Sequence, residues 1–202
     1  SRLMCFFSMT YALPIVASLC LGDGLEKVYA GSMLITLAVG VAGFLATRRH
    51  YRELRPRGGF LLVVLAWTMM ALIATLPFLM VFPRMSLTDA YFETMSGLTT
   101  TGATVMTGLD TLMPSVNLWR HELNWLGGMG IIVLAVAVLP LLGVGGMQLY
   151  KAEVPGPLKD SKLTARISDT AKALWIIYFG LTAACTLSLW LAGMSGFDAL
   201  CH

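Results

Sequence analysis

The chain has 202 residues, of which 57% are hydrophobic and only 12% are charged, and its formal net charge is +3. Soluble globular domains carry about 25% charged residues, so the composition excludes an ordinary water-soluble domain. It also disfavours a nucleic-acid partner, because the basic residues gather only in two loops between apolar stretches. The composition therefore indicates an all-α integral membrane protein, surrounded by membrane lipid.

Five apolar stretches contain no charged residue, and each is long enough to cross a bilayer, which takes about 20 helical residues. These stretches are residues 3–22, 28–47, 60–82, 123–150 and 173–197. We predict that all five are transmembrane helices. The four cysteines show no metal-ligand spacing and are assigned to packing.

The charged residues predict how these helices are oriented. Residues 48–57 contain five arginines and one acid, and residues 151–172 contain five basic residues and three acids. The alternate segments contain three basic and seven acidic residues. Since loops rich in Lys and Arg stay in the cytoplasm, both basic loops and the N-terminus are predicted to be cytoplasmic.

The outer segment between the third and fourth stretches, residues 83–122, is too long and too apolar for a simple connection. Ser86 or Thr88 can cap a helix here, and Asp89 suits the positive end of that helix. A helix of about ten residues spans roughly 15 Å, which is half of the hydrocarbon thickness. We predict a short helix that enters the membrane from outside and then returns as a loop.

The predicted helix ends in the run Thr99-Thr100-Thr101-Gly102-Ala103-Thr104. Threonine is a poor helix former, and glycine permits non-helical backbone angles. Irregular backbone at membrane depth is tolerated only where it is buried in protein or lines a polar cavity, and the negative end of the helix favours a cation there. The run predicts a cation pore loop with carbonyl ligands, although a simple threonine-rich kink is an alternative.

A short repeat supports the pore interpretation. Ser86-Leu87-Thr88-Asp89-Ala90 and Ser195-Gly196-Phe197-Asp198-Ala199 each follow one outward span. We expect a helix–pore loop–helix repeat whose second copy is cut short, so that the chain is part of a longer protein. The expected division is two leading transmembrane helices (1–57), a first complete repeat (58–150), a cytoplasmic loop (151–172) and the start of a second repeat (173–202).

Four motifs stand out along the chain: Gly97–Thr104, Trp125–Leu134, Gly143–Tyr150 and Pro155–Asp160. Together they resemble bacterial potassium-uptake proteins of the Trk/Ktr/HKT superfamily, specifically their TrkH-like membrane subunits. The resemblance covers essentially the whole chain, as the N-terminal portion of such a protein. It implies a pseudo-fourfold pore of four repeats in one chain, preceded by two helices without a pore loop.

The resemblance also implies the transported ion and the partners. K+ would be taken up across the bacterial inner membrane by a homodimer that works with a cytoplasmic nucleotide-binding subunit of the TrkA type. No organic cofactor is implied, and whether transport is channel-like or ion-coupled, as in a symporter, stays open. Carried over by position, Thr100 and Thr101 are ion ligands, Thr99 precedes them, and Gly102 is the filter glycine. Ala103 stands where longer potassium-channel filters continue with an aromatic residue.

Other residues are candidates for supporting the loop. Glu93 would attract cations or brace the filter together with Ala103, while Gly127 and Gly128 would pack behind it or serve ordinary helix packing. Trp119 is assigned to an aromatic belt at the membrane interface, and the neighbouring Arg120, His121 and Glu122 to an interfacial anchor, with cation funnelling as the minor alternative.

Two other function classes compete with a pore. A membrane-embedded enzyme should show a catalytic pair at membrane depth, such as His with Asp or Ser with Lys, and the sequence offers none. We therefore predict no enzymatic activity. A non-channel carrier would use the broken loop as a substrate site, but carriers more often break their spanning helices than the segments between them.

Overall fold

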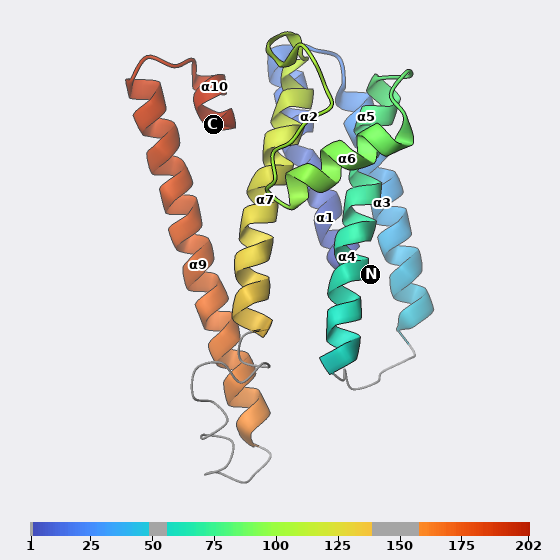
Figure 1. Cartoon of the computed structure of the whole chain (residues 1–202), viewed down its shortest axis with the longest axis vertical. Helices are drawn as coiled ribbons and strands as arrows, with labels where there is room; N and C mark the ends of the chain where they lie inside the picture. The colour runs from blue at the N-terminus through green and yellow to red at the C-terminus, as the bar shows by residue number, and fades with distance from the viewer. Residues whose placement is uncertain (1, 49–55, 139–157) are drawn as a thin grey trace. The chain divides into compact units, whose positions relative to one another are not determined.

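The computed structural model describes residues 2–48, 56–138 and 158–202, and these residues form helices and no strand (Figure 1). They form two compact units, Ser1–Trp125 and Leu126–His202, and α7 belongs to both. The helices are α1 (Arg2–Phe7), η1 (Ser8–Tyr11), α2 (Ala12–Leu21), α3 (Glu26–Thr47), α4 (Pro56–Ala74), α5 (Leu76–Val81), α6 (Leu87–Leu98), η2 (Leu109–Thr111), α7 (Pro114–Val138), α9 (Leu158–Leu191) and α10 (Gly196–Cys201).

Four helical stretches are long and apolar enough to cross a membrane: Leu3–Leu21, Glu26–Thr47, Leu61–Val81 and Asp169–Leu191. They coincide with four of the five predicted spans, which confirms an all-helical membrane fold. The remaining predicted span, 123–150, continues into residues 139–150, which lie outside the described residues. Its described part belongs to α7, and this helix begins at Pro114.

The first unit opens with a leading hairpin, which we define as residues 2–47. Its arms α1 and α3 approach each other closely at Gly40, where an added Cβ would lie 2.8 Å from Sγ and 2.9 Å from the backbone nitrogen of Cys5. The turn between α2 and α3 uses Gly22 and Gly24 at φ +71° and +76°. Glycine adopts these left-handed angles without a Cβ penalty, so the chain can reverse within four residues.

The third span is broken, which the sequence analysis did not predict. Helix α4 ends at Ala74 and α5 begins at Leu76, with Pro77 in its first turn. Proline has no N–H, so the carbonyl of Ile73, four residues earlier, loses its helical donor. The N–H of Thr75 bonds to Leu72 at 3.4 Å, which leaves the Ala71 carbonyl without its usual partner as well.

Side chains from other elements supply the missing donors. The last four carbonyls of a helix have no donor within it, and in a bilayer each unpaired one costs several kcal/mol. Here all four accept a side-chain hydrogen bond: Ala71 from Thr94 of α6 (2.8 Å), Leu72 from Thr75 (2.6 Å), Ile73 from Tyr11 of the leading hairpin (3.2 Å) and Ala74 from Trp119 of α7 (3.2 Å). We call this set of carbonyls and donors the α4 junction.

Trp119 lies at the centre of the core of the first unit. Its side chain is fully buried, and its ring stacks on Tyr11 with centroids 4.5 Å apart and an interplanar angle of 21°. The rings of Phe7 and Tyr29 lie 6.2 and 6.4 Å away. The predicted place of Trp119 in an interfacial aromatic belt is therefore wrong, because the leading hairpin covers the indole.

In the second unit, α9 ends at Leu191 with two hydrogen bonds of the Schellman type, from Gly193 N to Trp190 O and from Met194 N to Leu189 O. Gly193 has the left-handed φ of +102° that this helix ending requires. Helix α10 begins three residues later and packs on α9.

Candidate functional site: the re-entrant loop

Helix α6 begins where the sequence predicts a cap. Ser86 has an extended backbone, its Oγ accepts a hydrogen bond from the N–H of Asp89 (3.0 Å), and it donates to the Asp89 carboxylate (2.7 Å). Ser195 and Asp198 repeat this arrangement at the start of α10, with corresponding distances of 3.1 and 2.7 Å. The two copies of the Ser-x-x-Asp-Ala motif thus form the same capped helix start, and the alanine that ends each copy is fully buried.

The other end of α6 is a second Schellman ending, with threonine where glycine is usual. Thr100 N bonds to Gly97 O at 2.8 Å and Thr101 N bonds to Ser96 O at 2.9 Å. Thr100 has φ +58°, and it is the one non-glycine residue with positive φ among the residues that the structure describes. A β-branched residue pays about 1–2 kcal/mol for this conformation, whereas Gly193 of α9 adopts it freely.

The backbone stays irregular after Thr100. Gly102 has φ +72°, and an added Cβ there would meet nothing within 4 Å. Within the described ranges, no hydrogen bond ends on a carbonyl oxygen from Thr99 to Gly102, and residues 100–105 are exposed. Four consecutive carbonyls that carry no intramolecular hydrogen bond at the negative end of a helix provide acceptor groups for a cation.

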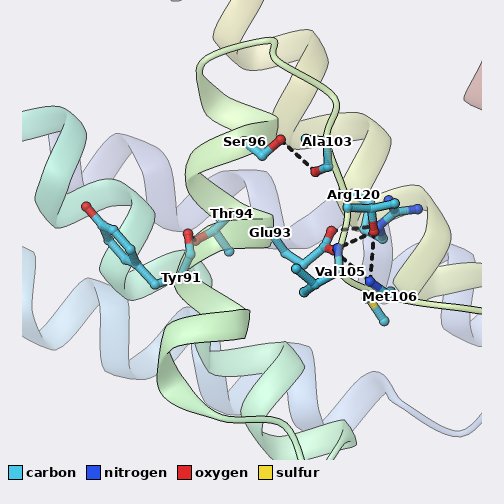
Figure 2. Close-up of polar contacts among 9 residues, drawn as sticks. Tyr91, Glu93, Thr94, Ser96, Ala103, Val105, Met106 and Arg120 are labelled. Carbon is cyan, nitrogen blue, oxygen red and sulfur yellow. Dashed lines mark hydrogen bonds and ion pairs between the residues drawn. The ribbon is translucent and has the colours of Figure 1, made fainter.

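Hydroxyl groups hold the two arms of this turn together. Ser96 Oγ donates to the carbonyl of Ala103 at 2.7 Å (Figure 2). The hydroxyls of Thr99 and Thr101 lie 2.8 Å apart. Ala103 therefore differs from the four residues before it, since its carbonyl is already occupied. The supporting role of Ala103 in the loop stays a prediction.

The side chain of Glu93 extends from α6 to Thr104–Met106, which we call the descending arm of the loop (Figure 2). One carboxylate oxygen accepts hydrogen bonds from the hydroxyl of Thr104, from Val105 N at 2.6 Å and from Met106 N at 3.2 Å. The residue is 5% exposed. Buried carboxylates are costly unless hydrogen-bonded, and this one is fully engaged with the loop, so the geometry favours bracing over direct attraction of ions.

The second oxygen of Glu93 pairs with Arg120. The Nε atom of Arg120 lies 3.4 Å from Oε2, and the two side chains are 15% and 3% exposed. An interfacial anchor is therefore the wrong assignment for Arg120, because its guanidinium faces α6. Glu122 is also buried, with 8% exposure, and its Oε2 atom has no hydrogen-bond partner among the described residues, so it does not anchor the helix in the interface either.

A glycine that the sequence analysis did not single out brings α6 and α7 together. An added Cβ on Gly97 would lie 3.0 Å from Cβ of Leu123 and 3.8 Å from the Arg120 carbonyl. Close approach at this point places Arg120 within reach of Glu93. The predicted Gly127 and Gly128 lie in the second unit, so their packing behind the loop stays a prediction.

No cluster of three or more His, Cys, Asp or Glu residues in the described part of the chain has metal-binding spacing. The candidate ligands of the loop are thus backbone carbonyls and threonine hydroxyls. Hard, weakly charged cations suit such neutral oxygens.

Comparisons with known proteins identify the family of the chain. Residues 25–202 match the family model "TrkH: Cation transport protein". The chain is 52% identical over 201 residues to a "Trk system potassium uptake protein TrkH" of Vibrio parahaemolyticus and 51% identical to that of Escherichia coli strain K12, in both cases over 99% of this chain. It is 42% identical to "Trk system potassium uptake protein TrkG" of the same Escherichia coli strain.

The fold also matches a solved structure. The crystal structure of the potassium transporter TrkH from Vibrio parahaemolyticus superposes with a TM-score of 0.84 and 46% identity, covering 100% of this chain and 40% of the other. The chain spans 41% and 42% of the Vibrio and Escherichia coli relatives. By sequence and by fold, the chain belongs to the TrkH family of cation transport proteins.

Proposed function

We propose that the complete protein containing this chain takes up K+ across the bacterial inner membrane, with the carbonyls of Thr99, Thr100, Thr101 and Gly102 forming one quarter of a selectivity filter. Thr100 and Thr101 are the principal ion ligands. The observation that carries the proposal is the run of four carbonyls without an intramolecular hydrogen bond, held at the C-terminal end of α6 by left-handed residues at positions 100 and 102. The names of the relatives support K+ as the ion.

The strain at Thr100 supports a functional role for the loop. Backbone strain persists only where the surrounding structure enforces it, and it concentrates at ligand sites. Here Glu93, Ser96 and the α6–α7 contact at Gly97 enforce the path of the chain on both sides of the strained residue. A rigid, pre-formed ring of oxygens can replace the hydration shell of an ion without reorganising.

The alternative, a non-channel carrier, would use the broken loop as its substrate site, although carriers more often bind their substrates where a spanning helix is broken. The third span is indeed broken, between α4 and α5. Its four terminal carbonyls, however, are all occupied by side-chain donors from the protein itself. The break therefore offers no free acceptors to a substrate, whereas the re-entrant loop does, and this difference favours a pore.

The test replaces Gly102 with alanine in the complete protein. There is room for the methyl group, so the substitution acts through the left-handed φ of residue 102. Alanine pays about 1–2 kcal/mol for this backbone conformation, and about 1.4 kcal/mol corresponds to a tenfold change in an equilibrium constant. We expect the ratio of K+ to Na+ uptake to fall by about tenfold in cells that lack other potassium uptake systems. Gly24→Ala is the matched control, since Gly24 also has a left-handed φ (+76°) and open space around it, but lies in the turn between α2 and α3 of the leading hairpin. Equal ratios for Gly102→Ala and the parent protein would contradict the filter.

The assembly follows from the same proposal. We propose a homodimer with a cytoplasmic nucleotide-binding subunit of the TrkA type, a cytoplasmic N-terminus, and the four-part division at residues 57, 150 and 172. These points rest on the sequence resemblance and on membership of the family. Co-purification of the subunit with the complete membrane protein, and protease or label access to an N-terminal tag from the cytoplasmic side, test them.

A further inference from the structure

The leading hairpin has no pore loop, yet it packs on the elements that hold the filter loop. We propose that the hairpin positions this loop, and that Tyr11 and Trp119 are the positioning residues through which it acts. The inference rests on the proposed function of the loop. It depends on four contacts within the first unit.

The first contact joins the hairpin to α7. The Tyr11 ring stacks on that of Trp119 with centroids 4.5 Å apart. The rings of Phe7 in α1 and Tyr29 in α3 also pack on the indole. Trp119, Tyr11 and Tyr29 are all fully buried. Aromatic rings packed in this way have few alternative arrangements, so α7 cannot shift at Trp119 without the hairpin.

The second contact is the α4 junction. Tyr11 donates to Ile73 O, Trp119 donates to Ala74 O, and Thr94 of the pore helix α6 donates to Ala71 O. The hairpin, α7 and α6 each donate a hydrogen bond to the last turn of α4, which fixes their positions on this turn. Since no water replaces these donors inside a bilayer, losing one of them leaves a carbonyl unpaired and favours a shift of the neighbouring elements.

The third contact fixes the beginning of α7. Asp23, in the turn between α2 and α3, accepts a hydrogen bond from Ser115 N at 2.9 Å, and it also accepts from Ser18 and from Leu25 N. A carboxylate is favourable at the positive N-terminus of a helix. The hairpin thus holds α7 at two places, Ser115 and Trp119, which are one helical turn apart.

The fourth contact carries this position to the loop. Arg120 follows Trp119 directly, and successive helical residues point about 100° apart, so Trp119 faces the hairpin while Arg120 faces α6. Arg120 pairs with Glu93, and Glu93 accepts from the amides of Val105 and Met106. A change in the position of α7 therefore moves the carboxylate that holds the descending arm of the filter loop (Figure 2).

Two conservative variants of the complete protein test the proposal. Tyr11→Phe removes only the hydroxyl that donates to Ile73, and Trp119→Phe removes the indole N–H but keeps a ring. We expect each to lower the ratio of Rb+ to Na+ uptake by about threefold or more, at unchanged abundance in the membrane, and to speed hydrogen exchange at Val105 and Met106. Trp190→Phe is the control, because Trp190 lies in the second unit and is 59% exposed.

A double-mutant cycle separates positioning from general destabilisation. If Trp119 acts through Arg120, Trp119→Phe should change the uptake ratio little further in an Arg120→Gln background. The proposal would be overturned if the effects of Trp119→Phe and Arg120→Gln on the uptake ratio multiply in the double variant. It would also be overturned if Tyr11→Phe and Trp119→Phe show the uptake ratio and the loop amide exchange of the parent. Should Gly102→Ala and Arg120→Gln both leave selectivity unchanged, the filter assignment fails, and the amide exchange still decides whether the hairpin positions the loop.

Discussion

Gly97 of α6 packs against Leu123 of α7 with no room for a side chain between the helices, since a Cβ at position 97 would lie 3.0 Å from the Cβ of Leu123. A Cβ atom is fixed to the backbone, so neither residue can give way by a rotamer change. The separation of the two helices is thus set by the missing side chain at Gly97. The same separation decides whether Arg120 reaches Glu93.

Gly97→Ala should therefore separate α6 from α7. Overpacking of this kind costs roughly 1–3 kcal/mol, and we expect the thermal stability of the detergent-solubilised protein to fall together with the K+ to Na+ uptake ratio. Gly180→Ala is the control, because Gly180 lies in the middle of α9 with nothing within 4 Å of an added Cβ. Its stability should be unchanged or slightly higher, as alanine is the better helix former. Equal thermal stability and equal uptake ratios for the two variants would show that the packing of α6 on α7 does not require a glycine at position 97.

Removing the carboxylate of Glu93 should release the descending arm of the loop. Glu93→Ala removes the acceptor of the Val105 amide and of the Thr104 hydroxyl and the partner of the Arg120 guanidinium, while the Met106 amide keeps its bond to Thr104. Breaking a buried pair costs about 3 kcal/mol or more. Glu93→Gln retains an acceptor oxygen for the amides, so its loss should be smaller. Asp169→Ala is the comparison, because its ion pair with Lys172 joins side chains that are 76% and 73% exposed. Such a pair contributes little, and thermal unfolding should show the contrast.

The features predicted well from sequence are those that depend on local residues. The apolar runs predicted four of the described spans, and the Ser-x-x-Asp-Ala motifs predicted both helix caps, because a serine side chain and an N–H three residues away interact within one turn. The helix-breaking residues Thr99–Gly102 predicted the end of α6 and the irregular turn after it in the same way, whereas the role of this turn as a filter stays a prediction. Each of these signals is complete within a short stretch of chain.

The features that were missed depend on packing between distant segments. Trp119 is assigned to an interfacial belt because it lies near a predicted membrane boundary, and nothing in the local sequence shows that Tyr11 and Phe7 cover it. Arg120 was misassigned for the same reason, since its partner is 27 residues away. The break in the third span did carry a signal, Pro77 within an apolar run, but the side chains that occupy its free carbonyls come from three other elements.

Thr100→Gly tests whether the strained threonine serves transport or folding. Glycine adopts φ +58° freely, so the variant should be more stable by about 1 kcal/mol in thermal unfolding. Its K+ to Na+ uptake ratio should nevertheless fall if these carbonyls form the proposed filter, because a more flexible backbone holds them less rigidly. Gly193→Ala makes the reverse change at the equivalent position of α9 and should be destabilised by a similar amount. A Thr100→Gly protein with lower stability would show that the threonine side chain is needed for the fold itself.

The hydrogen bonds that the Asp23 carboxylate accepts should make the contact between the hairpin and α7 depend on pH. Burial alone would raise the pKa of Asp23, but hydrogen bonds from Ser115, Ser18 and Leu25 N outweigh it and hold the pKa below its ordinary value of 3.8. A lowered pKa means that the folded state favours the carboxylate, so the stabilisation is complete above pH 3.8 and is lost as the pH falls through the lowered value.

Asp23→Asn should therefore be less stable than the parent at pH 7, and the difference in thermal unfolding between the two proteins should shrink as the pH is lowered below 3.8. Asp89→Asn is a matched control for the charge of an acid near a helix start, because Asp89 contacts only its own cap residue Ser86 among the hydrogen bonds described. Amide exchange at Ser115 locates the effect, since Ser115 N is the donor to Asp23. A difference between parent and Asp23→Asn that stays constant from pH 7 to below pH 3.8, or an Asp23→Asn protein with unaltered exchange at Ser115, would show that the charge of Asp23 does not hold α7.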